Sequence, residues 1–468
     1  MNQAVRTLGL FLLIMLITGA IDSVRNLPAT ALFGPSLVFF FVFSAIVFLI
    51  PAGLISAELS SAWTEQGGIY DWVRMAFGEK VALIAIWLQW INTMVWYPTI
   101  LSFIAGVIAY MVNPELANNK LYLVSVILVV FWGLTLINFR GVHTSARFAS
   151  VCALVGMILP MMLIIGLALL WLVQGRPLNV HFTLHNVFPH LGETDSWISL
   201  TAIMTSFLGM ELATVHVRYV TNAQQVFPRA LMISVIFILF TMVFGSLAIA
   251  IVLPHDQINL VNGIMQAFDA FLSAYHLQAL LPMLTVLIFL GTLGGIINWI
   301  ISPAKGLLRA AQSGYFPRYF AEENSRSVPA RMLFLQAVLV SVMCAAFFLM
   351  PSVNGSYWLL TALSTQLYMV MYVFMFVAAI RLRYKYPDRR RPFRIPGGKY
   401  VGMWVLGLLG VLGSVITLVV GFFPPGGIDV GGQVHYELVF TSGMMLMMLP
   451  VLFFYAYKKY TKKTNSAA

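Results

Sequence analysis

Two short stretches of this chain place ionisable and helix-breaking residues inside apolar runs. The first, residues 18–28, carries Asp22 and Arg25 together with a glycine and a proline, and the second, residues 205–211, carries Gly209 and Glu211. An unpaired charge in apolar surroundings is costly, so such residues are read first as functional. Both stretches are therefore candidate binding elements.

A helix interrupted inside an apolar layer offers two kinds of free backbone group. The half that begins there exposes N–H groups and a positive dipole end, which favour a carboxylate. The half that ends there exposes carbonyl groups, which favour an ammonium group. An α-amino acid carries both groups on one carbon, so two such breaks suit a zwitterion better than a sugar or a metal ion.

The substrate-binding residues predicted from this reasoning come from both stretches and from three other apolar runs. They are Thr18, Gly19, Asp22, Ser23, Arg25, Asn26, Phe207, Gly209, Glu211, Trp96, Asn298 and Tyr372. Two structural alternatives stay open. Asp22 and Arg25 are three residues apart and could simply neutralise each other on one helix face. Trp96, Asn298 and Tyr372 could equally make helix–helix contacts or anchor the chain at an interface.

The composition requires lipid as the main solvent. Of the 468 residues, 60% are hydrophobic and 9% are charged, and the mean hydropathy is +0.89. A soluble domain carries about 25% charged residues, which this chain cannot supply to a water-facing surface. The chain is thus predicted to be an all-α integral membrane protein.

Apolar runs long enough to cross the hydrocarbon recur twelve times along the chain. They cover residues 8–33, 37–62, 81–112, 121–138, 148–173, 197–217, 230–253, 279–303, 331–350, 357–380, 401–423 and 438–457. The two interrupted stretches fall in the first and the sixth run, which fits a repeat of five helices with two helices added. We expect a single transporter domain over residues 1–457. Its first repeat would span 8–173, its second 197–380 and the additional helices 401–457, before a short basic cytoplasmic tail, 458–468.

The basic residues predict the orientation. If both termini are cytoplasmic, all but three of the 27 Lys and Arg residues lie in cytoplasmic segments, the exceptions being Arg25, Lys120 and Arg176. This is the asymmetry of the positive-inside rule. It also accounts for the net charge of +11 without nucleic acid, because such loops face anionic headgroups.

Several function classes have no support in the sequence. The two cysteines lie within predicted spans and indicate neither a disulfide framework nor a metal site. There is no catalytic Ser/His/Asp set, metal-ligand spacing or phosphate-binding loop, so we expect neither an enzyme nor a bound metal or cofactor. A channel is also disfavoured, because no pore-lining repeat of charge is present.

Several further segments resemble one known family. They are Pro35–Phe40, Glu65–Tyr70, Phe207–Glu211 running on to His216, Asn259–Gln266, Trp299–Gly306 and Pro396–Lys399. In this order and spacing the chain resembles the amino acid–polyamine–organocation transporters, and among them the bacterial glutamate/γ-aminobutyrate antiporters. The resemblance covers nearly the whole chain, although no single segment is diagnostic.

The resemblance implies twelve helices, a LeuT-like 5+5 inverted repeat with broken helices 1 and 6, and alternating access. It places the substrate-contacting breaks on Thr18–Asn26 and Phe207–Glu211. The chain departs from the antiporters at Asp22 and Arg25, at Gly295, where the resemblance implies an acidic residue, and in its short tail. Substrate and pH gating are therefore expected to differ.

Two transport functions follow. The first is an amino acid antiporter that exchanges one amino acid for another or for its decarboxylated amine, with the glutamate/γ-aminobutyrate type as one candidate and Arg25 holding a carboxylate. The second is a proton-coupled symporter, since Asp22 and Glu211 are carboxyl groups in an apolar site. We expect a small amino acid and membrane lipids as partners, a monomer or homodimer, and the bacterial inner membrane as location.

Overall fold

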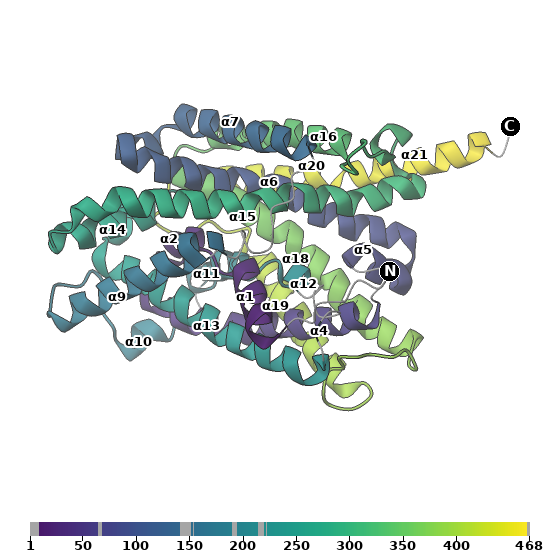
Figure 1. Cartoon of the computed structure of the whole chain (residues 1–468), viewed down its shortest axis with the longest axis horizontal. Helices are drawn as coiled ribbons and strands as arrows, with labels where there is room; N and C mark the ends of the chain where they lie inside the picture. Colours follow the sequence, from purple (N-terminus) through teal and green to yellow (C-terminus); the bar gives the residue numbers. More distant parts are fainter. Residues whose placement is uncertain are drawn as a thin grey trace.

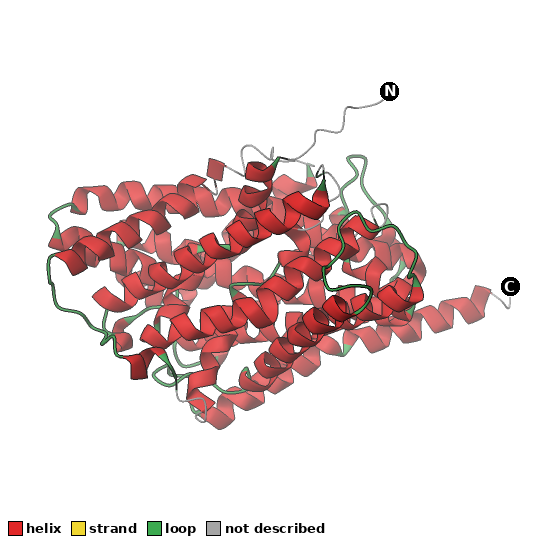
Figure 2. Ribbon diagram, turned by 90° about the horizontal axis from the view of Figure 1, so that it is seen from below, coloured by secondary structure: helices red, strands yellow, loops and turns green. Residues whose placement is uncertain are grey.

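Apolar helices make up almost all of the described chain. The computed structural model describes residues 9–63, 68–140, 151–152, 154–189, 194–213, 220 and 222–465, and this part contains helices and loops but no β-strand (Figure 2). A backbone in lipid has no water to pair with, so helices that satisfy their own N–H and C=O groups are the expected solution. This confirms the predicted all-α fold.

The α-helices have the following bounds. They are α1 (Leu10–Ile21), α2 (Leu27–Ala31), α3 (Leu37–Ser44), α4 (Ile50–Ala62), α5 (Ile69–Phe77), α6 (Glu79–Val112), α7 (Lys120–Phe139), α9 (Leu159–Val173), α10 (Leu184–Val187), α11 (Thr194–Thr205), α12 (Met210–Ala213), α13 (Ala223–Val252), α14 (Gly263–Ala274), α15 (Leu281–Ala310), α16 (Ala330–Met343), α17 (Ala346–Leu349), α18 (Val353–Lys385), α19 (Val401–Val420), α20 (Gln433–Met448) and α21 (Pro450–Asn465).

Ten helical segments of the described residues are long and apolar enough to cross a membrane. They correspond to the predicted spans 2–5 and 7–12. The first and the sixth span are each divided into shorter helices, α1 with η1 (Val24–Asn26) and α2 in one, and α11 with α12 in the other. The ten long segments and the two divided spans thus agree with the predicted twelve spans, interrupted in the first and the sixth. The division into two inverted repeats stays a prediction.

The ends of some helices differ from the predicted ones. The eighth span was expected to stop at Pro303, but α15 continues to Ala310 with that proline inside it. A proline removes one backbone hydrogen bond and usually ends or kinks a helix. Here α15 packs along α6, and those contacts keep the helix continuous. The last helix, α21, also runs on to Asn465, into the segment predicted to be a tail.

The long helices α6, α15 and α18 form the centre of the bundle, with α6 packed against both others. In Figure 1 the helices run roughly from left to right, with α9, α10 and α14 toward the left-hand end and α5 and the end of α21 toward the right-hand end. The broken helices lie between α6, α13 and α18. They are thus surrounded by protein, where irregular backbone can be tolerated.

A buried ion-pair cluster ties the α18–α19 loop to the bundle. Glu58 of α4 pairs with Arg383 at 2.9 Å and with Arg391 at 3.1 Å, and it accepts the Ile395 N–H at 2.8 Å. Burial lowers the pKa of Arg391, but the Glu58 carboxylate opposes that shift, so the guanidinium stays charged. The loop is therefore held on α4 by charges that water hardly screens.

Candidate functional site

The first break consists of two extended residues between α1 and η1. Asp22 has φ −66° and ψ 139°, and Ser23 has φ −159° and ψ 123°. The Asp22 N–H still donates to the Thr18 carbonyl at 2.8 Å, and the helix resumes with the Asn26 N–H donating to the Ser23 carbonyl at 3.1 Å. The last carbonyls of α1 and the first N–H groups of η1 therefore have no partner within a helix.

The second break is the turn 206–209 between α11 and α12. It ends at Gly209, whose φ of +96° is a conformation that residues with a Cβ rarely adopt. The Gly209 N–H donates to the Tyr372 hydroxyl of α18 at 3.1 Å. Gly209 thus ends the turn between α11 and α12, and Tyr372 holds this turn against α18.

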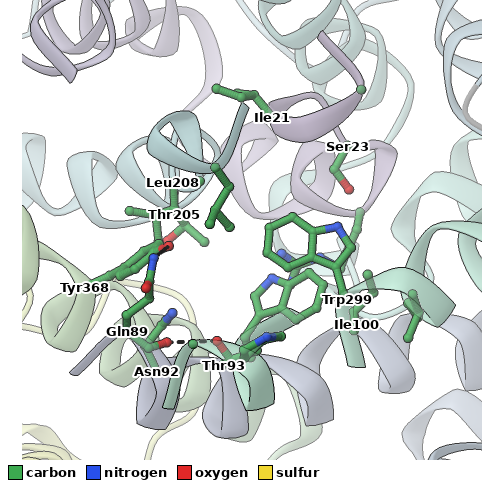
Figure 3. A pocket seen from close by; sticks show the side chains of 18 of the residues that line it. Ile21, Ser23, Gln89, Asn92, Thr93, Ile100, Thr205, Leu208, Trp299 and Tyr368 are labelled. Carbon is green, nitrogen blue, oxygen red and sulfur yellow. Dashed lines mark hydrogen bonds between the residues drawn. The ribbon is translucent and has the colours of Figure 1, made fainter. Parts of the chain in front are cut away.

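The two breaks face one cavity of about 640 Å³, called the central cavity below. It is lined by the first break, by α6, α11, α15 and α18, and by the residues around Gly209. In Figure 3 the labelled side chains of Ile21 and Ser23 lie on one side of this space, with Gln89, Asn92 and Thr93 opposite them. A cavity of this volume is large enough for a small organic molecule.

One wall of the central cavity is polar and another is aromatic. Gln89, Asn92 and Thr93 extend from consecutive turns of α6, with the Tyr368 hydroxyl of α18 at 3.4 Å from the Gln89 amide nitrogen. The rings of Trp96 and Trp299 pack with their centroids 5.6 Å apart. Such a lining provides a few polar contacts beside an apolar surface, the usual design of a small-molecule site.

Arg25 lies at the aromatic wall. Its Nη1 donates to the Thr99 hydroxyl at 2.7 Å and to the Tyr357 hydroxyl at 3.4 Å, and its guanidinium lies 5.5 Å from the centre of the Trp96 ring. The side chain is 4% exposed, and its buried Nε has no hydrogen-bond partner. Arg25 is thus a positioned cation at the cavity with donor capacity left.

Asp22 turns away from Arg25, toward α13. Its Oδ2 lies 2.8 Å from the Thr241 hydroxyl, and its Oδ1 is buried without a partner. No ion pair joins Asp22 and Arg25 within the described residues. The alternative that the two simply neutralise each other is therefore wrong.

Glu211 lies behind the cavity wall. Its carboxylate accepts hydrogen bonds from the hydroxyls of Tyr368 and Tyr372 and from the Gln89 amide at 2.9 Å. These donors come from α18 and α6, and Tyr372 also receives the Gly209 N–H. Glu211 thus connects the second break to the two central helices.

At one end the central cavity reaches α5 and the far part of α15. Asp71 pairs there with Arg309 at 2.5 Å and with Arg74 at 3.1 Å. Burial raises the pKa of Tyr70, so its phenol stays neutral and donates to the Ser313 hydroxyl at 3.1 Å. Asp71, Arg309 and Tyr70 all line the cavity, so this end is a charged mouth.

The opposite side of the cavity is formed by the packed rings of Trp96 and Trp299 and by Arg25, which contacts α6 and α18. At the crossing of η5 (Leu154–Ile158) and α15, a Cβ added to Gly156 would lie 2.3 Å from the Cα of Gly291, so these backbones touch. Both glycines line the cavity, and their missing side chains keep its wall closely packed.

The structure places most of the predicted site residues around the central cavity. Those that line it are Gly19, Asp22, Ser23, Arg25, Asn26, Trp96 and Gly209. Thr18, Phe207, Glu211 and Tyr372 are buried beside the breaks without lining it, and the Phe207 ring packs on Phe41. The side chain of Asn298 and the motif residues Glu65–Gly67 and His216 lie outside the described residues.

Several lining residues were not among the predicted site residues. Gln89, Thr93, Thr205 and Leu208 line the cavity from α6 and from the second break. Gln89 and Thr93 lie one turn apart on the same face of a largely apolar helix, a spacing that could have indicated them. Among the described residues, no group of three or more His, Cys, Asp or Glu side chains could hold a metal ion.

Comparisons with known proteins identify relatives along nearly the whole chain. Residues 8–450 match the family model described as amino acid permease. An uncharacterized transporter of Legionella pneumophila is 39% identical over 454 residues, covering 97% of each chain. A glutamate/gamma-aminobutyrate antiporter of Lactococcus lactis is 26% identical over 466 residues, covering 98% of this chain and 92% of the relative. A probable agmatine/putrescine antiporter of the same species is 23% identical over 371 residues, covering 79% and 78%.

Proposed function

The chain belongs to the amino acid permease family, whose members are membrane transporters and not enzymes, and from this premise we propose that it is an amino acid antiporter. It exchanges one amino acid for another, or for its decarboxylated amine, by alternating access across the bacterial inner membrane. The multi-pass helical fold supports a transporter of this kind. The antiport mode is supported by the names of two relatives, an antiporter of glutamate and γ-aminobutyrate and a probable antiporter of agmatine and putrescine.

One observation carries the proposal: both helix breaks border the same cavity. The carbonyl end of α1 and the N–H end of η1 are separated by only Asp22 and Ser23. An α-amino acid placed there can direct its ammonium group to the carbonyls and its carboxylate to the N–H groups, as the dipoles of the two half-helices require. A sugar would leave both ends without a charged partner.

The side chains around the breaks complete the site. Arg25 lines the cavity and provides a guanidinium for a carboxylate. Gln89, Thr93 and Tyr368 provide neutral polar groups for the remainder of the substrate, and Trp96 and Trp299 cover its apolar part. Glu211 does not contact the substrate in this proposal. It fixes the second break through Tyr372.

The conformation fits one stage of alternating access. The cavity reaches the end of the bundle with α5, Lys305 and Arg309, which the positive-inside rule assigns to the cytoplasm. On the opposite side, Arg25 donates to Thr99, and the rings of Trp96 and Trp299 pack together. We assign this arrangement to an inward-facing state with both termini cytoplasmic.

Counterflow in liposomes tests the proposal. The purified protein is reconstituted and loaded with one unlabelled amino acid or amine from a panel, and uptake of trace radiolabelled amino acid is followed. Internal substrate should raise uptake severalfold over empty liposomes. Absence of counterflow with every amino acid and amine tested would refute antiport.

A matched pair of variants connects the activity to the cavity. Thr93→Leu adds apolar volume to the cavity wall and should abolish counterflow. Ser325→Leu adds the same side chain on an exposed loop and should leave counterflow intact. Equal activity of the two variants would show that the substrate binds elsewhere.

A further inference from the structure

The carboxyl group of Asp22 is surrounded by too few hydrogen-bond donors for a charge. Its Oδ1 is completely buried and has no partner, and its Oδ2 meets the hydroxyl of Thr241. The other polar group beside it is the backbone N–H of Ser23. The whole residue is 4% exposed.

The contacts of Thr241 indicate whether the proton between Asp22 Oδ2 and Thr241 Oγ1 belongs to the carboxyl group or to the threonine hydroxyl. Its Oγ1 lies 2.8 Å from Asp22 Oδ2, 3.0 Å from the Phe237 carbonyl oxygen and 3.1 Å from the Ile238 carbonyl oxygen. Carbonyl oxygens only accept, and a hydroxyl has one proton to give. An ionised Asp22 would therefore compete with both carbonyls for a single proton.

A protonated Asp22 removes this conflict. Its own O–H then donates to Thr241 Oγ1, and the Thr241 hydroxyl donates to the carbonyl of Phe237 four residues earlier, a common bond for threonine in a helix. Asp22 Oδ2, Thr241 Oγ1 and the Phe237 carbonyl oxygen then each have a suitable hydrogen-bond partner. The geometry around Thr241 thus fits the neutral acid.

Among the side chains that the structure describes, no cation forms an ion pair with Asp22. On the elements packed against α1 and η1, the charged side chains within this described part are Arg25, Glu211 and Arg229. Arg25 is directed to α6 and α18, and Glu211 is itself an acid, held by the hydroxyls of Tyr368 and Tyr372. Arg229 lies twelve residues before Thr241, about 18 Å along α13. Asp71, Lys305 and Arg309 lie at the cavity mouth, where Asp71 and Arg309 pair with each other.

Glu211 provides the internal comparison. It is equally buried, but two tyrosine hydroxyls and the Gln89 amide donate to its oxygens. Hydrogen bonds donated to a carboxylate favour its charged form, whereas burial of a carboxyl group that lacks donors favours the neutral acid. The two carboxyl groups of the site are thus in opposite environments.

We propose that Asp22 is a proton-binding site of the transport cycle, protonated in this conformation and deprotonated when the break of α1 opens to water. The proton leaves the carboxyl oxygen for bulk water and returns when the break closes against α13. Its place at the break makes this coupling direct, because Ile21 and Ser23, the residues on either side, face the cavity (Figure 3). Only the predicted effect on transport rests on the proposed transport activity. The protonation of Asp22 does not depend on it and can be measured on the protein alone.

The first experiment needs no substrate. Infrared spectra of the purified, full-length protein at neutral pH should contain the carbonyl stretch of a protonated carboxyl group, which is separate from the carboxylate bands. Asp22→Asn should remove this band. Asp269→Asn, a partly exposed acid of α14 outside the cavity, is the matched control and should leave it unchanged. Retention of the full band in Asp22→Asn, or absence of any such band in the wild type, would overturn the proposal.

A second variant keeps the test decisive if Asp22→Asn does not fold. Thr241→Val leaves the carboxyl group but removes the hydroxyl that accepts the proton of the neutral acid. The band should change frequency, and its disappearance with rising pH should move downward by about one pH unit. A titration identical to the wild type would contradict the proposed contact.

The consequence for transport is measured by self-exchange of L-glutamate, with equal pH on both sides of the liposome membrane. Between about pH 5 and 8 the free amino acid keeps one charge state. Wild-type exchange should fall as the pH rises through the infrared midpoint, and Thr241→Val should shift that fall in parallel. If no amino acid exchanges, the proposed function fails while the infrared result stands. If exchange is independent of pH although the band titrates, the coupling is refuted and antiport remains.

Discussion

Replacing Arg25 by Gln separates binding of a carboxylate from a purely structural role. The guanidinium is held by Thr99 at 2.7 Å and by Tyr357 at 3.4 Å, over the Trp96 ring, and its Nε is left without a partner. A structural role would require only these protein contacts. A binding role requires in addition that the free donor capacity meets the substrate carboxylate.

The two roles predict different magnitudes. A hydrogen bond to a charged group contributes about 1.5–3 kcal/mol, which corresponds to about a 10- to 150-fold change in KM. Arg25→Gln should impose this loss on an amino acid but spare an amine that carries no carboxylate. Arg25→Lys should lose less, because it keeps the charge and lacks only the planar fork.

The assay is competition against labelled amino acid in counterflow, with inhibition constants measured for one monocarboxylic amino acid and for its decarboxylated amine, which keeps no carboxylate. The matched control is Thr99→Val, which removes the 2.7 Å contact and leaves the cation. It should lower thermal stability without changing the ratio of the two constants. Equal losses for both ligands in Arg25→Gln would refute the role of Arg25 in carboxylate binding.

Three further predictions concern the elements that support the site. Glu58→Gln leaves Arg383 and Arg391 buried without their carboxylate and should lower the free energy of unfolding by about 3–5 kcal/mol, measured by denaturation in detergent; an unchanged midpoint would show that the cluster is dispensable. Gly209→Ala forces a Cβ into a backbone with φ +96°, which should lower the free energy of unfolding by about 1–2 kcal/mol and slow counterflow. Gly166→Ala on α9 is the control and should have neither effect, because an added Cβ meets no atom there. Tyr372→Phe removes the hydroxyl shared by Gly209 and Glu211 and should cost about 1–3 kcal/mol, seen as a lower melting temperature; a melting temperature equal to that of the wild type would contradict the link.

The position of both breaks could be predicted from the sequence, because the signal is local. Asp22 and Arg25 are incompatible with an uninterrupted lipid-facing helix, and Gly209 next to Glu211 marks the second break. The structure interrupts its helices at these residues. The environment of each side chain was not predictable in this way, because it depends on distant residues. Asp22 contacts Thr241 and Arg25 contacts Tyr357, partners 219 and 332 residues away.

The predicted role of Glu211 illustrates the same limit. Its charge and its place beside Gly209 marked it as a substrate contact, but Tyr368 and Tyr372 of α18 surround the carboxylate. Those tyrosines are four residues apart and lie on one face of their helix, which only the packing of α18 against the second break directs to Glu211. The continuation of α15 through Pro303 has a similar cause, since contacts with α6 outweigh the local preference.

Substrate protection of a single cysteine tests most directly whether the amino acid binds between the two breaks. Thr93→Cys is placed in a background with Cys152 and Cys344 replaced, and the rate of alkylation is measured with and without saturating amino acid. Ser325→Cys, on an exposed loop outside the cavity, is the control. The account predicts that every amino acid that supports counterflow slows alkylation at position 93 and has no effect at position 325. Alkylation at position 93 that proceeds equally fast with a transported amino acid bound would contradict it.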